Sequence, residues 1–527
     1  MLPNKTVPKY LIILVLLTVA ISSRFIHIGA QSLFVDETWV VPNTNFHYEE
    51  KSIFPKLFTY EPFLRLSHAR QEFIRRVYDM HPLFQVAALH ATSDLHPPLF
   101  FFLNYYWGRW FGYAESIIRA PAAIYSIITL LLLLIILRRQ NVAFINSMVI
   151  LTFVVLSPIF LCFSNFARPY TLLMLFSLLS SYLCLELVRN SFKERYVFYF
   201  LMSALACLYT HYYGVFIVAS QVLYMLMENY FFSKKRQILK IVGIGIAVVL
   251  LFLPAAVIIV LKIKSKSPAA EQAVFEYFNL KILMDLILSF GFGYSRSTIH
   301  SPLNIFTAAI QTILLLMGIG YLWKTRGQMS SRFWLFFFLC PFLLIIIVNT
   351  LKPIFAIRNS LIILIPYLTI CGFGLYAIKN KIVKCSVYIG LGCVGLFFIY
   401  YGLSYENVRG KSAWEDWRSA GAFVKGIDHS LPVYVYPNSY RDPLYYYVPE
   451  INRIRGFPKN LTEEGLEDQE YILVLVKPED QSFKIERKIE KELPFLLRPD
   501  QYKVNYLNQF PHIFVYHVQT MDVSRHW

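Results

Sequence analysis

An acidic pair follows the first long apolar stretch of the sequence. Asp36 and Glu37 lie in the run Ser-Leu-Phe-Val-Asp-Glu-Thr-Trp, so apolar side chains flank both carboxyl groups. Apolar surroundings raise the pKa of an unpaired carboxylate, and such a group can take a proton from a hydroxyl. The alternative is an ordinary pair of solvated loop carboxylates. We interpret Asp36 as a candidate general base with Glu37 beside it.

Basic and aromatic residues at other ends of apolar stretches are candidates for binding. His96 precedes two prolines, which favour the start of a helix. Arg168 and Tyr170 flank a proline between two apolar stretches, and the guanidinium could bind a phosphate or orient a carboxylate. His211 and Tyr212 lie in a similar short polar segment. The alternative for His96 is a helix start with an incidental histidine, and the alternative for Arg168 and Tyr170 is interfacial anchoring, since Arg and Tyr are both common at headgroup depth.

Two further arginines complete the set. Arg358 is an isolated basic residue before an apolar run. Together with Lys352 it lies at the outer side of the predicted spans, whereas the basic clusters lie at the cytoplasmic side. Outward basic residues beside a lipid-embedded groove suit a lipid phosphate, and ordinary exceptions to the charge rule are the alternative. Arg119 opens the second predicted span within Arg-Ala-Pro and could pair with a loop carboxylate.

The composition indicates a membrane protein with many spans. The 527 residues are 56% hydrophobic, and the mean hydropathy is +0.48. The net charge of +17 comes mostly from clusters beside apolar stretches, so no nucleic-acid partner is predicted. All seven cysteines lie in or at the edge of apolar stretches, which predicts neither a disulfide framework nor a metal site. The sequence does not indicate a divalent metal, although the chemistry would tolerate one.

Charge and length together predict the topology. Lys and Arg flank spans on the cytoplasmic side, which places the N-terminus inside and the C-terminus outside. Residues 98–112 are short and interrupted by Arg109, and counting them as a span would move basic clusters outside, so we expect an interfacial helix there. About eleven spans remain: 10–29, 116–138, 142–163, 169–189, 196–211, 212–232, 238–262, 303–323, 332–350, 357–377 and 382–403. One long kinked helix is the alternative for 196–232.

Two loops and a tail are expected on the outer face. The loops are residues 30–97, which carry the acidic pair, and residues 263–302. The spans and loops make a membrane domain of residues 1–403, and the tail of residues 404–527 reads as a small α/β domain. It has an amphipathic helix at Ala413–Ile427 and a charged helix at Phe483–Leu493. The β-rich runs are Val433–Tyr436, Tyr471–Val476 and His512–His517.

The candidate motifs occur in an order that resembles a known group of enzymes. Asp-Glu follows the first helix, and His-Pro-Pro, Arg-Ala-Pro, Ala-Arg-Pro-Tyr and His-Tyr-Tyr-Gly come after it. This set is similar to that of bacterial membrane glycosyltransferases of GT-C architecture, the group of glycosyltransferase family 39, the protein O-mannosyltransferases and the aminoarabinose lipid A transferases. The resemblance covers residues 1–260 and extends more loosely to Arg358 and to residues 414–418.

The resemblance implies transfer of a sugar from a polyprenyl-phosphate donor to a lipid, glycan or protein acceptor. The reaction would be an inverting displacement at the outer face of the cell membrane, with the family's acidic residue at Asp36 and Glu37 beside it. Cationic groups would hold the leaving phosphate, so no cofactor or metal is required. Where the family has Arg-Tyr near the tenth span, this sequence has Arg358 followed by Asn359.

Two other classes of protein compete with a transferase. A transporter or flippase of a lipid-linked sugar would place its polar residues near the bilayer midplane on broken helices, often with inverted repeats. Here the candidates gather at one rim of the bilayer, and no repeat is evident. A nonenzymatic scaffold for a polymerase would need no acidic residue in apolar surroundings.

Overall fold

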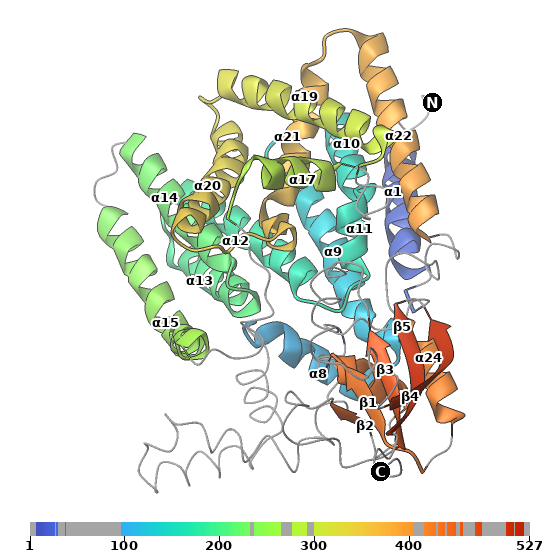
Figure 1. The fold of residues 1–527 in the computed structure, drawn as a ribbon. Helices are drawn as coiled ribbons and strands as arrows, with labels where there is room; N and C mark the ends of the chain where they lie inside the picture. The colour runs from blue at the N-terminus through green and yellow to red at the C-terminus, as the bar shows by residue number, and fades with distance from the viewer. Residues whose placement is uncertain are drawn as a thin grey trace, which may run out of the picture. The chain divides into compact units, whose positions relative to one another are not determined.

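The computed structural model divides the chain into two compact units (Figure 1). The first comprises Met1–Ile26, Leu57–Trp110 and Arg119–Tyr401, and the second His27–Lys56, Phe111–Ile118 and Gly402–Trp527. The residues that the structure describes are 7–26, 28–29, 37, 96–231, 237–264, 277–291, 300–403, 416–427, 430–437, 440–448, 454–456, 470–476, 502–510 and 512–520.

The first unit is built from apolar helices (Figure 1). They are α1 (Val7–Phe25), α8 (Leu99–Phe111), α9 (Glu115–Arg139), α10 (Phe144–Val155), α11 (Pro158–Ser164), α12 (Tyr170–Arg189), α13 (Glu194–Thr210), α14 (Gly214–Phe231), α15 (Ile238–Lys264), α17 (Leu280–Phe290), α19 (Pro302–Lys324), α20 (Met329–Leu351), the 3₁₀ helix η2 (Ile357–Ile363), α21 (Leu364–Ala377) and α22 (Lys381–Leu403).

Among the described residues, seven helical segments are long and apolar enough to cross a membrane, or eight if a bent pair counts as one span. The chain is therefore a multi-pass membrane protein. A helix lies at each of the eleven predicted positions, but the number of crossings and their orientation stay predictions. The chain forms two helices, α13 and α14, across residues 196–232, joined by a short turn. The sequence analysis did not anticipate α17.

The predicted span 142–163 is broken. Helices α10 and α11 meet at an angle of 63°. Ser157 is extended there, with φ −67° and ψ 115°, and Pro158 follows as the first residue of α11. A proline has no backbone N–H and disfavours helical geometry in the residue before it, which accounts for the break. The bend brings α11 to an end just before the turn that carries Arg168.

Two glycines allow α19 and α21 to pack backbone to backbone. A Cβ atom added to Gly318 would lie 2.0 Å from the carbonyl oxygen of Ile370, and one added to Gly374 would lie 1.8 Å from that of Leu314. Small residues let the backbones of membrane helices approach this closely. Helix α21 is buried along nearly its whole length, as expected for the central helix of a bundle.

A buried ion pair fixes the start of α20. Arg332 forms a two-pronged contact with Glu228 of α14, at 2.6 Å from Nε to Oε1 and 2.9 Å from Nη2 to Oε2. Arg332 also donates from Nη1 to the carbonyl oxygens of Arg326 and Gly327 in the α19–α20 connection. The Glu228 side chain is fully buried, so its charge depends on this partner.

The described strands of the second unit form a five-stranded sheet with the order β2-β1-β3-β5-β4. Strands β1, β2 and β3 are parallel, whereas β5 runs antiparallel to both β3 and β4. The strands are β1 (Val433–Tyr436), β2 (Ile454–Gly456), β3 (Glu470–Val476), β4 (Tyr502–Phe510) and β5 (Ile513–Thr520). Of the predicted elements, the helix at Phe483–Leu493 lies outside the described residues. Strands β2 and β4 were not anticipated.

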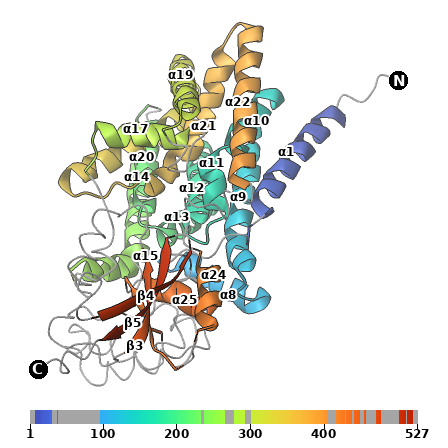
Figure 2. The ribbon, with the colours of Figure 1, turned by 45° about the vertical axis from the view of Figure 1, so that its right-hand side comes forward.

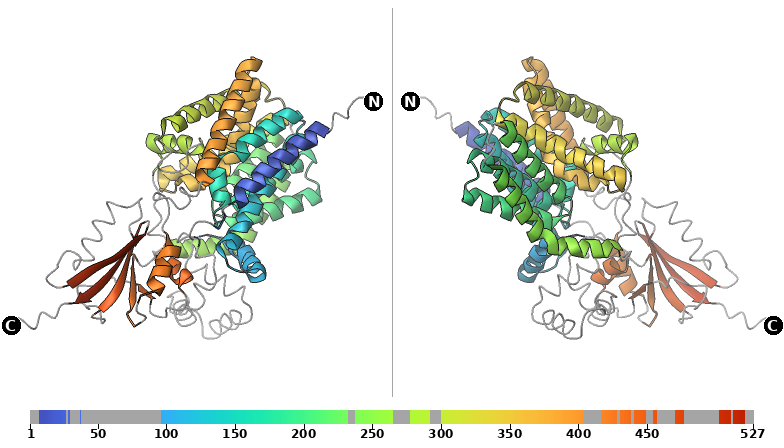
Figure 3. Two further views of the ribbon diagram at one scale, coloured as in Figure 1. Left: turned by 90° about the vertical axis from the view of Figure 1, so that its right-hand side faces the viewer. Right: turned by 90° about the vertical axis from the view of Figure 1, so that its left-hand side faces the viewer.

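Two short helices cover one face of this sheet (Figures 2 and 3). They are α24 (Trp417–Lys425) and α25 (Arg441–Tyr447). Trp417, Val424 and Leu444 pack with Val433 and Val474 of the strands in one buried cluster. Valines and isoleucines alternate along the strands toward this cluster, while tyrosines such as those of β1 point to the other face.

A carboxylate joins distant segments of the second unit. Glu115 accepts hydrogen bonds from the Arg418 guanidinium and from the Tyr447 hydroxyl. The same Arg418 nitrogen, Nη2, donates to the carbonyl oxygen of Gly29 at 2.9 Å, and the Tyr446 hydroxyl donates to the carbonyl oxygen of Tyr113 at 2.9 Å. This unit therefore includes chain on both sides of the first predicted outer loop, in addition to the C-terminal tail.

Candidate functional site

The first element of the site is the chain before α8. His96 is followed by two prolines, and α8 begins one residue after them. The amide of Phe102 donates to the carbonyl oxygen of Pro98 at 3.0 Å, so the helical bonding starts at the second proline. A proline at a helix start loses no hydrogen bond, because the first amides of a helix have no partner within it. His96 is thus held at a fixed point just outside the helix.

The second element is the turn between α11 and α12. The amide of Arg168 donates to the carbonyl oxygen of Phe166 at 2.7 Å, and Pro169 starts α12. Arg168 is 3% exposed and Tyr170 1% exposed, so neither is an ordinary surface anchor. The ring of Tyr170 packs on Phe163 of α11 with the centroids 4.9 Å apart. The break before α11 therefore helps to place both side chains.

The third element is the turn between α13 and α14. His211 ends α13, and its Nδ1 accepts from the backbone N–H of Tyr213 at 3.1 Å. Gly214 closes the turn by donating to the carbonyl oxygen of His211 at 2.9 Å. A Cβ atom at Gly214 would lie 2.8 Å from the carbonyl oxygen of Cys207, so only glycine fits without a shift. His211 is buried, with 4% of its surface exposed.

These three elements bring four predicted residues together. Arg168 Nη2 lies 3.2 Å from His96 Nδ1, and the ring centroids of His96 and His211 are 4.9 Å apart. The Tyr170 ring lies 6.5 Å from that of His96 and 5.9 Å from that of His211. We call His96, Arg168, Tyr170 and His211 the rim cluster. The cluster draws on residues up to 115 positions apart (96 to 211) that lie within one compact unit.

Hydrogen bonding fixes the protonation of both histidines. A guanidinium only donates, so His96 must accept at Nδ1 and carry its proton on Nε2. His211 accepts at Nδ1 from a backbone N–H, which puts its proton on Nε2 as well. The rim cluster thus presents a guanidinium and two imidazole Nε2–H groups, all of which are donors. Such a set recognises an anion and is poorly suited to act as a base.

The loop that carries Arg358 is held beside the His211 turn. The side-chain oxygen of Asn349 accepts from the amides of Ile354 at 2.7 Å and Phe355 at 2.9 Å. The Tyr213 hydroxyl donates to the carbonyl oxygen of Ile354. Arg358 itself is exposed, in the first turn of η2.

Tyr213 also contacts Asn359, the residue at which this sequence departs from the family pattern. The Tyr213 side chain is hydrogen-bonded with Asn359 and interacts with the charge of Arg358. Asn359 occupies the position at which the family has a tyrosine. It is buried beside Tyr213 of the turn between α13 and α14. The charge of Arg358 therefore interacts with Tyr213 in the turn that holds His211.

The remaining candidates are placed less fully. Asp36 lies outside the described residues, and Glu37 is buried with 1% of its surface exposed. Arg119 is 4% exposed in the first part of α9, and Tyr212 is half-buried, with its ring 6.4 Å from that of His211. No cluster of three or more His, Cys, Asp or Glu that could hold a metal occurs among the described residues.

The sequence analysis missed two residues that support the site. Tyr213 lies in the His-Tyr-Tyr-Gly motif, but its role in holding the Arg358 loop depends on a contact 141 residues away. Asn349 lies near the end of an apolar helix, and its side chain caps the following loop. A buried polar residue in an otherwise apolar helix end was the only signal that could have indicated it.

Among the solved structures similar to this chain, two match over nearly the whole length of both chains. ArnT from Cupriavidus metallidurans in the apo state matches with a TM-score of 0.55 and 9% sequence identity, over 96% of this chain and 97% of that chain. The same protein bound to undecaprenyl phosphate matches with a TM-score of 0.56 over the same shares. The chain has the GT-C fold. At this identity the likeness concerns the fold alone.

A further solved structure matches nearly the whole of this chain but less than half of its own length. The arabinofuranosyltransferase AftD from Mycobacteria matches 96% of this chain and 40% of its own length, with 12% identity and a TM-score of 0.49. No protein-family model matches the sequence, and no curated protein matches it either.

Proposed function

We propose that this GT-C protein is an inverting glycosyltransferase that moves a sugar from a polyprenyl-phosphate donor to an acceptor. The observation that carries the proposal is the rim cluster, in which Arg168 contacts His96 and the rings of His96 and His211 lie 4.9 Å apart. Three donors of this kind suit the phosphate that leaves with the polyprenyl chain. The undecaprenyl phosphate bound to the structurally similar ArnT supports a donor of this class.

In the proposed reaction Asp36 is the general base. The acceptor hydroxyl oxygen attacks the anomeric carbon of the sugar, and Asp36 takes the hydroxyl proton. The bond between that carbon and the phosphate oxygen breaks, and its electron pair leaves on the polyprenyl phosphate. Attack from the face opposite the phosphate inverts the anomeric centre. Arg168 and Arg358 neutralise the charge that develops on the phosphate.

Glu37 and Arg119 have supporting roles in this proposal. Glu37, which is buried, orients Asp36. Arg119, which is buried in the first part of α9, is a candidate partner for these carboxylates. No metal is required, because the leaving group is already a phosphate.

We also propose that the site lies on the outer face of the cell membrane. The support is the charge pattern: Arg138 and Arg139 end α9 at the opposite end from Arg119, and Arg189 ends α12 at the opposite end from Tyr170. The acceptor, whether lipid, glycan or protein, would reach the site from that side. A flippase of a lipid-linked sugar remains the alternative, and it would require no general base.

A complementation experiment separates these functions. A strain that lacks the gene is complemented with the wild-type protein, with Asp36→Asn or with Glu194→Gln, an exposed carboxylate at the start of α13. Mass spectrometry of envelope glycans and lipids then shows which sugar is missing. We expect Asp36→Asn to lower its level by at least a hundredfold, the lower range for a positioned base, while Glu194→Gln restores it. Restoration by Asp36→Asn would exclude the transferase mechanism and favour the flippase.

A further inference from the structure

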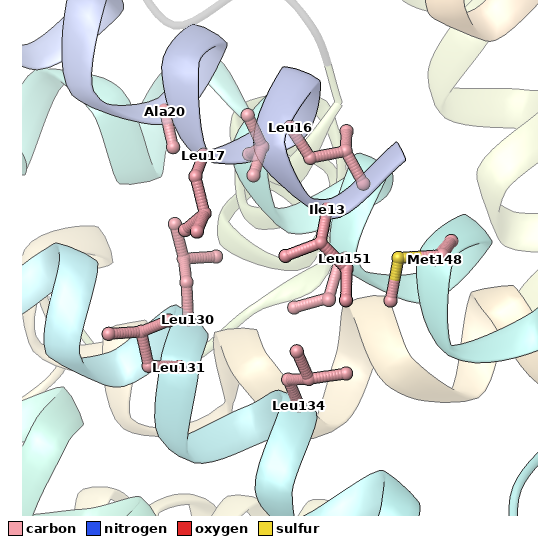
Figure 4. A pocket seen from close by; sticks show the side chains of 10 residues that line it. Ile13, Leu16, Leu17, Ala20, Leu130, Leu131, Leu134, Met148 and Leu151 are labelled. Carbon is pink, nitrogen blue, oxygen red and sulfur yellow. The ribbon is translucent and has the colours of Figure 1, made fainter. Parts of the chain in front are cut away.

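A narrow apolar crevice lies between α1, α9 and α10 (Figure 4). It encloses about 320 Å³ of empty space, the open space at its mouth included. All of its lining residues are apolar: Ile13, Leu16, Leu17, Ala20, Leu130, Leu131, Leu134, Met148, Leu151 and Val155. None belongs to the rim cluster. Leu131 is 39% exposed, so the crevice opens on the surface that faces the hydrocarbon of the bilayer.

A buried arginine stands at one end of this crevice. The Nη1 atom of Arg24 donates to the carbonyl oxygen of Ala20 at 3.1 Å, and Nε donates to the hydroxyl of Ser126 at 2.9 Å. Ala20 lines the crevice, and Ser126 lies one helical turn from Leu130, which also lines it. The guanidinium is therefore placed where the crevice reaches the last turn of α1. Lipid headgroups are found at this depth of a spanning helix.

The partners of Arg24 leave its charge uncompensated. The side chain is fully buried, and its described contacts are two hydroxyls, one carbonyl and the ring of Phe160, which lies 5.1 Å from the guanidinium carbon. Among the described residues, no carboxylate lies within ion-pair distance of Arg24, and Nη2 is buried without a hydrogen-bond partner. A buried cation without an anion is strongly disfavoured, so such a group indicates a missing anionic partner.

We propose that Arg24 and the crevice form a binding site for an anionic phospholipid of the bilayer. One acyl chain lies in the crevice against α9 and α10, and the phosphate of the headgroup binds Arg24 through Nη2. Binding requires the guanidinium to turn as a unit toward the crevice, so that it exchanges its neutral partners, the hydroxyls of Ser23 and Ser126 and the carbonyl oxygen of Ala20, for the phosphate. A phospholipid fits better than the sugar donor because the crevice opens to the bilayer and shares no residue with the rim cluster.

The site has a structural consequence for the first helix. Helix α1 contacts α10 and α11, and the crevice runs along the seam between α1 and its neighbours. A lipid in this seam would fill the gap and neutralise the one fully buried arginine of α1. The lipid would thereby hold α1 against α9. The proposal is independent of the sugar chemistry, and its test needs no substrate.

The test measures lipid-dependent stability of the full-length protein in detergent. Thermal unfolding is followed by tryptophan fluorescence while phosphatidylglycerol or phosphatidylcholine with the same acyl chains is added. We expect a rise in Tm with phosphatidylglycerol that is larger than with phosphatidylcholine. In Arg24→Met the apparent affinity for phosphatidylglycerol should fall about tenfold to a hundredfold, the range expected for loss of one charge-assisted contact. Without lipid, Arg24→Met should unfold at or above the wild-type Tm, because it removes an uncompensated charge.

Two further variants keep the test decisive. Arg138→Met removes an exposed arginine at the other end of α9 and should keep the wild-type preference for phosphatidylglycerol. Leu131→Trp fills the mouth of the crevice and should weaken phosphatidylglycerol binding although Arg24 is intact. An undiminished preference in Arg24→Met, or an equal loss in Arg138→Met, would overturn the proposal. An Arg24-dependent rise with undecaprenyl phosphate but not with phosphatidylglycerol would also overturn it and assign the crevice to the donor.

Discussion

Arg168 and His96 should act on donor binding as one unit. Arg168 is 3% exposed and holds the Nδ1 atom of His96 at 3.2 Å, so each substitution also alters the other residue. Arg168→Ala removes a charge-assisted contact with the donor phosphate, worth about 1.5–3 kcal/mol, and the affinity for a polyprenyl phosphate should fall about tenfold to a hundredfold. It also frees His96 to move its proton from Nε2 to Nδ1, which removes a second donor.

The coupling between the two residues can be measured directly. His96→Ala, Arg168→Ala and the double variant form a cycle, and binding of undecaprenyl phosphate to the reconstituted protein is the assay. Residues in direct contact are coupled by about 0.5–3 kcal/mol, so the double variant should lose clearly less than the sum of the single losses. His96→Gln keeps an N–H near the position of Nε2 and should retain more affinity than His96→Ala.

An exposed arginine provides the matched control. Arg195→Ala removes a guanidinium at the start of α13, where its partner is the neighbouring Tyr196 hydroxyl, and should leave donor affinity unchanged. Strictly additive losses for Arg168 and His96, within about 0.3–0.5 kcal/mol, would show that the hydrogen bond between them has no role in binding. Unchanged affinity in Arg168→Ala would assign this residue to interfacial anchoring.

Three further predictions concern the scaffold. Gly318→Ala should lower the free energy of unfolding by about 1–3 kcal/mol, because its Cβ would meet a carbonyl oxygen of α21 at 2.0 Å, whereas Gly320→Ala on the same helix has open space; thermal unfolding in detergent compares them. Glu228→Gln should cost about 3 kcal/mol, since it leaves Arg332 without its anion, and a stability equal to wild type would refute this. Tyr447→Phe should speed proteolysis of the C-terminal region, and an unchanged cleavage rate would contradict the assigned contact with Glu115.

The helices and the candidate site were predictable from the sequence for physical reasons. Apolar runs of about 20 residues bounded by Lys and Arg have few alternatives to spanning helices, and a helix lies at each predicted position. His96, Arg168 and His211 were recognisable because few ionisable residues lie at the ends of the predicted spans that the basic clusters do not flank. The structure brings these side chains together with Tyr170 in the rim cluster, and their role in binding or catalysis stays a prediction.

Other features depend on contacts between distant residues. The proline at the start of α11 was visible, but the 63° bend also depends on what the two halves pack against. Strand β2 has only three residues, and β4 alternates mostly polar residues, so neither carries a strong apolar pattern. The tautomers of His96 and His211 follow from partners that the sequence places 72 residues away and two residues away.

The contacts of Glu115 set a limit on how the chain can be divided. Its partners Arg418 and Tyr447 follow it by 303 and 332 residues, and Arg418 also reaches back 389 residues to Gly29. A ribosome completes the first helices long before these residues exist, so the carboxylate waits through most of synthesis for its partners. A fragment cut at residue 402 would separate them permanently. The compact unit of the C-terminal region is consequently completed by segments around Gly29 and Glu115, and a graft onto another membrane protein would have to carry the segment around Glu115 with it.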